Sequence, residues 1–175
     1  MGVSSPSPNP EAARRPNRRI ILVLLALLAL AFLYYLVRML TYNPNYVEAV
    51  YDANRVVLKS GEGVVLIGVD CPPVQEKSVG EPAAELTSKW VLHRYIRIEK
   101  DKEPKDAAGW ILGYVFVKKD GQEVFVNEDL LRHGFARVKL AYPNLKYRSK
   151  LEAAESEAKS KKIGLWSPDY RPQGS

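Results

Sequence analysis

The sequence has a single cysteine, Cys71, and two histidines, His93 and His133. One cysteine cannot form an intrachain disulfide, and it cannot build a thiolate metal site. The sequence also has no glycine-rich phosphate loop, no cysteine–histidine metal spacing, no nucleophile elbow and no internal repeat. These absences exclude the zinc-finger, phosphate-loop and serine-hydrolase classes that such motifs define.

Most of the chain also has little net charge. The formal net charge of the 175 residues is +6, but residues 1–40 contribute five arginines against Glu11 alone. Residues 41–175 contain 21 basic and 19 acidic side chains. The basic character therefore belongs largely to the N-terminal segment, and the rest argues only weakly for a polyanionic partner.

One long apolar run lies near the N-terminus. Ile20–Val37 is an unbroken series of uncharged, mostly aliphatic residues, which Met39 and Leu40 extend. About 20 such residues are needed to cross a bilayer core as a helix. We therefore expect a single transmembrane helix over 20–40, after a disordered basic arm over 1–19 and before a short linker over 41–45.

The charges beside this run predict its orientation. Four arginines precede it and only Arg38 follows closely, so the positive-inside rule places the N-terminus in the cytoplasm. The C-terminal domain is then extracytoplasmic, and the membrane is an expected partner. A cleaved signal peptide with a site near Ala29–Ala31 is the competing interpretation. The length of the apolar run favours the retained anchor.

The rest of the chain alternates short strands with a few helices. A hairpin is expected around Gly61, a helix beginning near Pro82, a short helix N-capped by Asn127, and a final helix closed by Gly164. This order predicts an α+β domain over 46–166, a small OB-like β-barrel with about three helices, followed by a flexible tail over 167–175. The expected strands are 46–51, 55–59, 64–69, 95–99, 110–117, 123–126 and 136–141.

Three segments resemble the staphylococcal nuclease domain, also called the thermonuclease-like, TNase-like or SNase-like domain. Val64–Pro72 resembles the strand that runs into the family's Asp-x-Pro-Glu motif. Val126–Ala136 resembles its short helix ending in Gly-x-Ala, and Leu151–Trp166 resembles its closing helix and Gly-Leu-Trp. Together they cover most of residues 46–166 in the right order, and the resemblance implies the same OB-like fold.

The resemblance also implies a chemistry. The family hydrolyses phosphodiesters with calcium held by carboxylates, two arginines on the phosphate and a glutamate that helps to activate water. Its Asp-Gly-Asp-Thr turn corresponds to residues 52–55, where Asp52 is kept and Asn54 replaces a calcium-binding aspartate. Ala53 also replaces a permissive glycine.

The other positions depart further. Val65, Pro73 and Trp110 stand where the resemblance places the first arginine, the glutamate and the second arginine. We therefore expect no catalytic residues. Asp70 is a candidate metal ligand, although a carboxylate that caps the turn before the prolines is the favoured interpretation. Calcium is expected only if the family activity persists, and no other cofactor is expected.

The apolar residues at the family's catalytic positions suggest that the former active-site cleft binds a partner instead. Val65 and Trp110 are candidate binding residues of an apolar cleft, because exposed apolar patches often mark interaction surfaces. Inward packing of Trp110 into the core is an equal alternative. Basic residues form a candidate nucleic-acid face, although a solvated charged surface explains them as well. They are Lys118, Lys119, Lys146, Arg148 and Lys150.

The sequence is consistent with three alternative functions. The favoured one is a membrane-anchored, non-catalytic pseudo-nuclease that binds a protein partner or serves as an accessory subunit of a membrane complex. The second is a non-cleaving binder of single-stranded nucleic acid, as OB-like barrels often are. The third is a calcium-dependent nuclease with a rearranged site, in which Asp70 would be essential.

Overall fold

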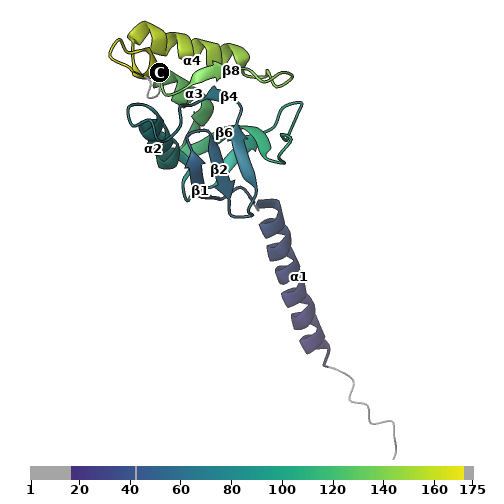
Figure 1. Cartoon of the computed structure of the whole chain (residues 1–175). Helices are drawn as coiled ribbons and strands as arrows, with labels where there is room; N and C mark the ends of the chain where they lie inside the picture. Colours follow the sequence, from purple (N-terminus) through teal and green to yellow (C-terminus); the bar gives the residue numbers. More distant parts are fainter. Residues whose placement is uncertain (1–16, 42, 172–175) are drawn as a thin grey trace, which may run out of the picture. The chain divides into compact units, whose positions relative to one another are not determined.

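The computed structural model describes residues 17–41 and 43–171, in two units that divide after residue 42 (Figure 1). Most of the predicted arm over 1–19 and the last four residues of the predicted tail lie outside the described residues.

The first unit contains one long helix. Helix α1 spans Arg18–Thr41, and its 24 residues extend about 36 Å at the usual helical rise. The segment Arg18–Leu40 has a mean hydropathy of 3.0 and buries none of its apolar window, so it is long and apolar enough to cross a membrane. A signal sequence would share these features. The retained anchor and its orientation stay predictions.

The second unit is an α+β domain, as predicted. Among the described residues, a six-stranded mixed sheet runs in the order β1-β2-β3-β6-β5, with β7 also paired to β6, and β4 pairs separately with β8. The β3–β6 pair is parallel and the other pairs are antiparallel. The strands are β1 (Val47–Asp52), β2 (Arg55–Leu58), β3 (Gly63–Leu66), β4 (Gly68–Asp70), β5 (Ile96–Glu99), β6 (Ile111–Lys119), β7 (Gln122–Phe125) and β8 (Arg137–Lys139).

The sheet curls without closing as a barrel. Strands β1 and β5 meet only through an isolated bridge between Tyr46 and Tyr95 and a few neighbouring backbone hydrogen bonds. Over residues 43–171, three α-helices and one 3-10 helix accompany the strands, in agreement with the prediction of about three helices. They are α2 (Gly80–Val91), α3 (Val126–Arg132), α4 (Arg148–Lys161) and η1 (Gly164–Trp166).

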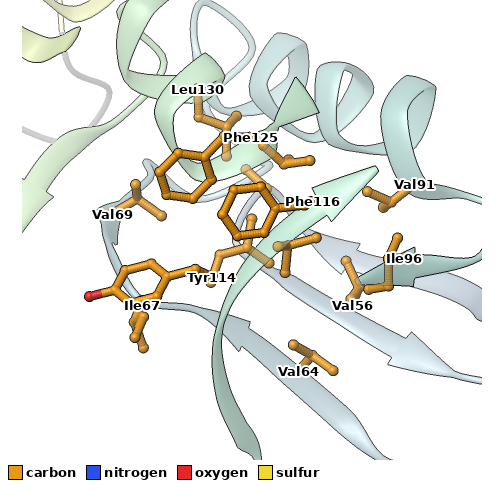
Figure 2. Close-up of a cluster of buried hydrophobic side chains, with 14 of the residues drawn as sticks. Val56, Val64, Ile67, Val69, Val91, Ile96, Tyr114, Phe116, Phe125 and Leu130 are labelled. Atoms are coloured by element: carbon orange, nitrogen blue, oxygen red, sulfur yellow. The ribbon is translucent and has the colours of Figure 1, made fainter. Parts of the chain in front are cut away.

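The core forms where β6 crosses the middle of the sheet. β6 is buried almost continuously because β3, β5 and β7 pair with it and α3 contacts it. Figure 2 shows Phe116 of β6 beside Phe125 of β7, and their rings stack with centroids 4.5 Å apart. Tyr114 lies on the same strand, and its ring and that of Phe125 form a T-shaped pair with centroids 6.0 Å apart.

The predicted role of Asn127 as a helix cap is wrong. Helix α3 begins one residue earlier, at Val126, and has no side-chain cap. Asn127 is fully buried, and its amide accepts the Val115 N–H at 2.9 Å and donates to the Ile67 carbonyl at 2.8 Å. The side chain therefore joins α3 to the sheet, since it satisfies backbone groups that would otherwise be buried without partners.

Two glycines fix the C-terminal segment against the domain. Gly134 follows α3 and Gly164 follows α4, both with positive φ, and the Leu165 N–H donates to the Gly134 carbonyl at 2.8 Å. A Cβ on either glycine would collide with the other segment's backbone. Leu165 is consequently buried, and Figure 1 shows α4 beside α3 and β8.

Candidate functional site

A cleft opens where the β1–β2 turn faces the end of β4. Its volume is about 430 Å³. Three predicted site residues, Val65, Asp70 and Pro73, line it together. The remaining lining residues are Asp52, Asn54, Arg55, Cys71, Pro72 and Asp106. The cleft therefore combines carboxylates and one guanidinium with apolar groups.

Arg55 is the functional candidate that the sequence interpretation missed. It pairs in register with Val65 on the neighbouring strand, so a guanidinium stands across from the first implied arginine position. The observed register is centred on Ser60, whereas the predicted hairpin is centred on Gly61. Counting outward from Gly61 would have paired Arg55 with Ile67, so the predicted turn did not reveal this pair.

This arginine is engaged with a carboxylate and a ring. Its Nη2 lies 2.5 Å from Asp52 Oδ2, and Nε donates to the same oxygen at 2.7 Å. The hydrogen bond to Asp52 raises the pKa of the Arg55 guanidinium. The Arg55 Cζ also lies 4.6 Å from the centre of the Tyr51 ring. Arg55 is thus the cation of the cleft, and Asp52 neutralises it.

The turn tolerates its departures from the family pattern. Asp52 Oδ1 accepts the Asn54 N–H at 3.1 Å, and the Asn54 side chain donates to the Val69 carbonyl at 3.3 Å. Ala53 is fully buried without a positive φ, so glycine is not required there. The Thr87 hydroxyl of α2 donates to the Ala53 carbonyl at 2.6 Å and holds the turn.

Asp70 ends β4 at the edge of the cleft. Its Oδ1 lies 3.1 Å from Lys139 Nζ on the paired strand β8, and both side chains are well exposed. Among the residues that the structure describes, no group of three or more histidine, cysteine or acidic side chains is placed to hold a metal. A calcium ion prefers six to eight oxygen ligands. Asp70 and the Asn54 amide oxygen fall well short of that set.

Trp110 lies beside the cleft rather than in its lining. Its indole covers the backbone of Gly63, where an added Cβ would overlap the ring. The backbone N–H of Trp110 donates to Asp106 Oδ1 at 2.9 Å, and the Trp110 and Tyr51 rings meet edge-on with centroids 6.4 Å apart. Trp110 is half-buried, and Tyr51 is 66% exposed. Trp110, Tyr51 and Arg55 therefore form a continuous surface, here called the aromatic row.

Two further groups near the cleft are poorly suited to catalysis. Burial, with added repulsion from Asp52 and Asp70, raises the pKa of the Cys71 thiol to about 12, so the nucleophilic thiolate is scarce at neutral pH. Glu76 is the first glutamate after Pro73, but it lines a second hollow of about 330 Å³ with Arg137 and Tyr170. Glu76 therefore does not replace the glutamate missing at position 73.

The predicted basic face is largely neutralised. Lys146 pairs with Glu99, Arg148 with Glu152 at 2.8 Å, and Lys150 with Glu128 at 2.9 Å. Lys119 Nζ lies 5.0 Å from the centre of the Trp90 ring. Such local pairing reduces the field that a phosphate backbone would meet.

Comparison with known proteins identifies the family. The family model described as "Staphylococcal nuclease homologue" matches residues 63–168. A thermonuclease of Staphylococcus intermedius is 39% identical over 130 residues, which cover 69% of this chain and 74% of that protein. A thermonuclease of Staphylococcus hyicus is 35% identical over 128 residues, 67% of this chain and 72% of that protein. The chain belongs to the staphylococcal nuclease family.

A further relative matches a smaller part of the chain. The endonuclease YncB of Bacillus subtilis is 40% identical over 90 residues, which cover 50% of this chain and 41% of that protein. The family match includes Val65, Asp70, Pro73 and Trp110, so the departures from the implied catalytic pattern fall inside the shared domain.

Proposed function

We propose that this chain is a membrane-anchored family member that does not cleave phosphodiesters by the family mechanism and instead binds a protein partner in or at the membrane. One observation carries the proposal. Val65 and Pro73 line the cleft, and the guanidinium that remains there is held by Asp52. The cleft therefore offers neither a free arginine nor a glutamate at the implied positions.

The energetic consequence is large. Phosphoryl transfer is catalysed mainly by fixed positive charge and precise positioning. Loss of a single such electrostatic group costs roughly 100- to 1,000-fold in rate. Replacement at three positions, 65, 73 and 110, is expected to remove turnover by this mechanism.

The aromatic row supports protein binding. Tyrosine, tryptophan and arginine are the residues most enriched at the centres of protein interfaces. Tyr51, Trp110 and Arg55 form one contiguous surface at the mouth of the cleft. A partner that covers Tyr51 would bury a ring that is 66% exposed in this chain.

A second candidate function rests on the pairing of Arg55 with Val65. If a ligand displaced Asp52, the guanidinium would face the position from which the implied arginine is missing. This would make the protein a phosphodiesterase with a rearranged site, or a nucleic-acid binder that uses Tyr51 and Trp110 as a stacking surface.

A cleavage and binding assay separates these functions. The full chain in detergent is mixed with fluorescent single-stranded DNA and RNA, with and without calcium. We expect no cleavage by the unaltered chain. The triple variant Val65→Arg, Pro73→Glu, Trp110→Arg tests whether restoring the implied residues restores turnover. Calcium-dependent cleavage by the unaltered chain that Asp70→Ala and Arg55→Gln abolish would instead establish the rearranged nuclease. Salt-sensitive binding without cleavage would establish the nucleic-acid binder.

Photo-crosslinking in native membranes tests the protein partner. A photoreactive phenylalanine analogue replaces Tyr51, and a matched probe replaces Tyr142, which is 84% exposed and lies outside the cleft lining. We expect one discrete crosslinked protein from position 51 that is absent from position 142. Equal or absent crosslinking at both positions would contradict a partner at the aromatic row.

A further inference from the structure

The domain's first residues are bound tightly to β5. Asn43 Nδ2 donates to the Ile96 carbonyl at 3.3 Å, and the Ile96 N–H donates to the Asn45 carbonyl at 3.0 Å. Helix α1 ends at Thr41. The segment between the apolar helix and the bonded residues is thus very short, since each residue extends the chain by at most about 3.6 Å.

A cluster of amphipathic side chains surrounds this point of entry. The Tyr46 ring meets the Tyr95 ring edge-on with centroids 5.2 Å apart, and it stacks on His93 at 6.5 Å. Lys59 Nζ lies 5.8 Å from the centre of the Tyr46 ring. Tyr95 is 61% exposed although it is large and aromatic. We call Tyr46, Lys59, His93, Arg94 and Tyr95 the tyrosine collar.

The backbone directs the collar outward. His93 has a φ of 56°, which reverses the chain between α2 and β5 and leaves His93, Arg94 and Tyr95 exposed in succession. The Val47 N–H donates to the Arg94 carbonyl, and the His93 N–H donates to the Val47 carbonyl. The collar is therefore built on rigid backbone at the start of β1, where its shape is fixed before any partner binds.

We propose that the tyrosine collar lies in the headgroup layer of the membrane that holds helix α1, and so fixes the domain against the bilayer. The inference rests on the membrane anchor in the proposed function. Tyrosine rings favour the interface because it accommodates an apolar ring and a polar hydroxyl at once. From Leu40 to Tyr46 the extended chain reaches at most about 21 Å.

The rings, more than charge, provide the attraction. Lys59 and Arg94 are exposed in the collar, but Glu48 is exposed two residues after Tyr46. A zwitterionic phosphatidylcholine surface is therefore a sufficient partner. Long basic side chains can still extend their apolar stems along the interface.

This contact would orient the cleft away from the bilayer. Tyr51 lies five residues beyond Tyr46 along β1, which corresponds to about 17 Å of strand. The aromatic row and the cleft adjoin that far end of β1. A collar in the headgroups would thus present the row to partners in solution beside the membrane.

Spin-label accessibility in phosphatidylcholine nanodiscs tests the inference on the full chain. Cys71→Ser removes the native thiol, and single nitroxide labels are placed by Ser60→Cys next to Lys59, by Tyr142→Cys as the exposed control, and by Leu30→Cys in the apolar helix. We expect oxygen, rather than an aqueous nickel complex, to relax the labels at 30 and 60. The label at 142 should show the opposite preference.

A collar variant makes the test specific. Tyr95→Ser in the Ser60→Cys background is expected to lower the docked-to-undocked ratio roughly tenfold, as expected for loss of part of one ring's burial. Tyr51→Ser, which removes an equally exposed ring at the far end of β1, should leave the label at 60 unchanged. If oxygen relaxes the label at residue 30 but only the nickel complex relaxes the label at residue 60, the membrane contact of the tyrosine collar is contradicted and the membrane anchor is not. An aqueous signal at 30 would overturn the anchor itself.

Discussion

Arg55 stands directly across from Val65 on paired strands, and its guanidinium is held by Asp52 at 2.5 Å. The family resemblance assigns a phosphate-binding arginine to position 65, which holds Val65. The guanidinium across from it is instead that of Arg55, on the adjacent strand. The Asp52 carboxylate decides whether that cation is available to a ligand.

Asp52→Asn should release this guanidinium. The variant removes one negative charge from the cleft and leaves Arg55 without its charged partner, so we expect affinity for a short single-stranded oligonucleotide to rise up to roughly tenfold at low salt. Fluorescence anisotropy measures the change. Adding Arg55→Gln should abolish the gain.

A matched variant controls for global charge. Glu152→Gln releases Arg148 from an exposed pair of similar length, 2.8 Å, outside the cleft lining. An equal gain in affinity from Glu152→Gln would show that net charge, and not the cleft, is responsible.

The second prediction concerns Gly63 and Trp110. Gly63→Ala places a methyl group where the indole lies, so we expect a loss of about 1–3 kcal/mol in the free energy of unfolding. Urea denaturation of Gly63→Ala, Trp110→Ala and the double variant measures the coupling. The cost of Gly63→Ala should largely disappear once Trp110 is alanine. Strict additivity would contradict the contact.

The third prediction concerns the Asn127 amide. Asn127→Ala leaves the Val115 N–H and the Ile67 carbonyl without this partner, and we expect a loss of about 2–4 kcal/mol in the free energy of unfolding. Urea denaturation measures the loss. Asn127→Asp should cost at least as much, because its buried carboxylate can accept the Val115 N–H but cannot donate to the Ile67 carbonyl. The exposed Gln122→Ala should change stability little. A similar result for Asn127→Ala would contradict the bridging role.

These residues show what local pattern can and cannot predict. Turn glycines, alternating strands and the helix near Pro82 predicted the α+β domain, because backbone propensity and burial are written into nearby residues. Asn127 was assigned as a cap because the same local signal fits a cap and a buried bridge. Only the packing of α3 on the sheet distinguishes the two roles.

The candidate site depends on longer-range contacts. Val65, Asp70 and Pro73 were predicted to share a site through the family resemblance, and the structure brings them to one cleft. The contact of Trp110 with Gly63 joins residues far apart in sequence through packing alone, which no periodicity reports. Arg55 was missed because a small error in the centre of the hairpin changes every cross-strand pair, and the observed register is centred on Ser60 rather than Gly61.

The last prediction concerns the pH dependence of stability. The ion pair and hydrogen bond with Lys146 lower the pKa of Glu99 below its usual 4.5, with help from Arg97 at 3.0 Å and the Tyr147 hydroxyl at 3.0 Å. A carboxyl with a lowered folded-state pKa contributes stability above its unfolded pKa and loses it as the pH falls through the folded value. We therefore expect the free energy of unfolding to decline below about pH 4.5 more steeply in the unaltered chain than in Glu99→Gln.

Urea denaturation at closely spaced pH values compares the two slopes. Tyr147→Phe keeps the ring and removes one hydrogen bond to Glu99, so its slope should fall between those of the unaltered chain and Glu99→Gln. Glu123 also has a pKa lowered by Arg97, so Glu99→Gln should flatten the decline without removing it. Parallel curves of unfolding free energy against pH for all three proteins would show that the neighbouring cations do not lower the pKa of Glu99. A shifted folded-state pKa and a pH-dependent stability are the same free energy measured in two ways.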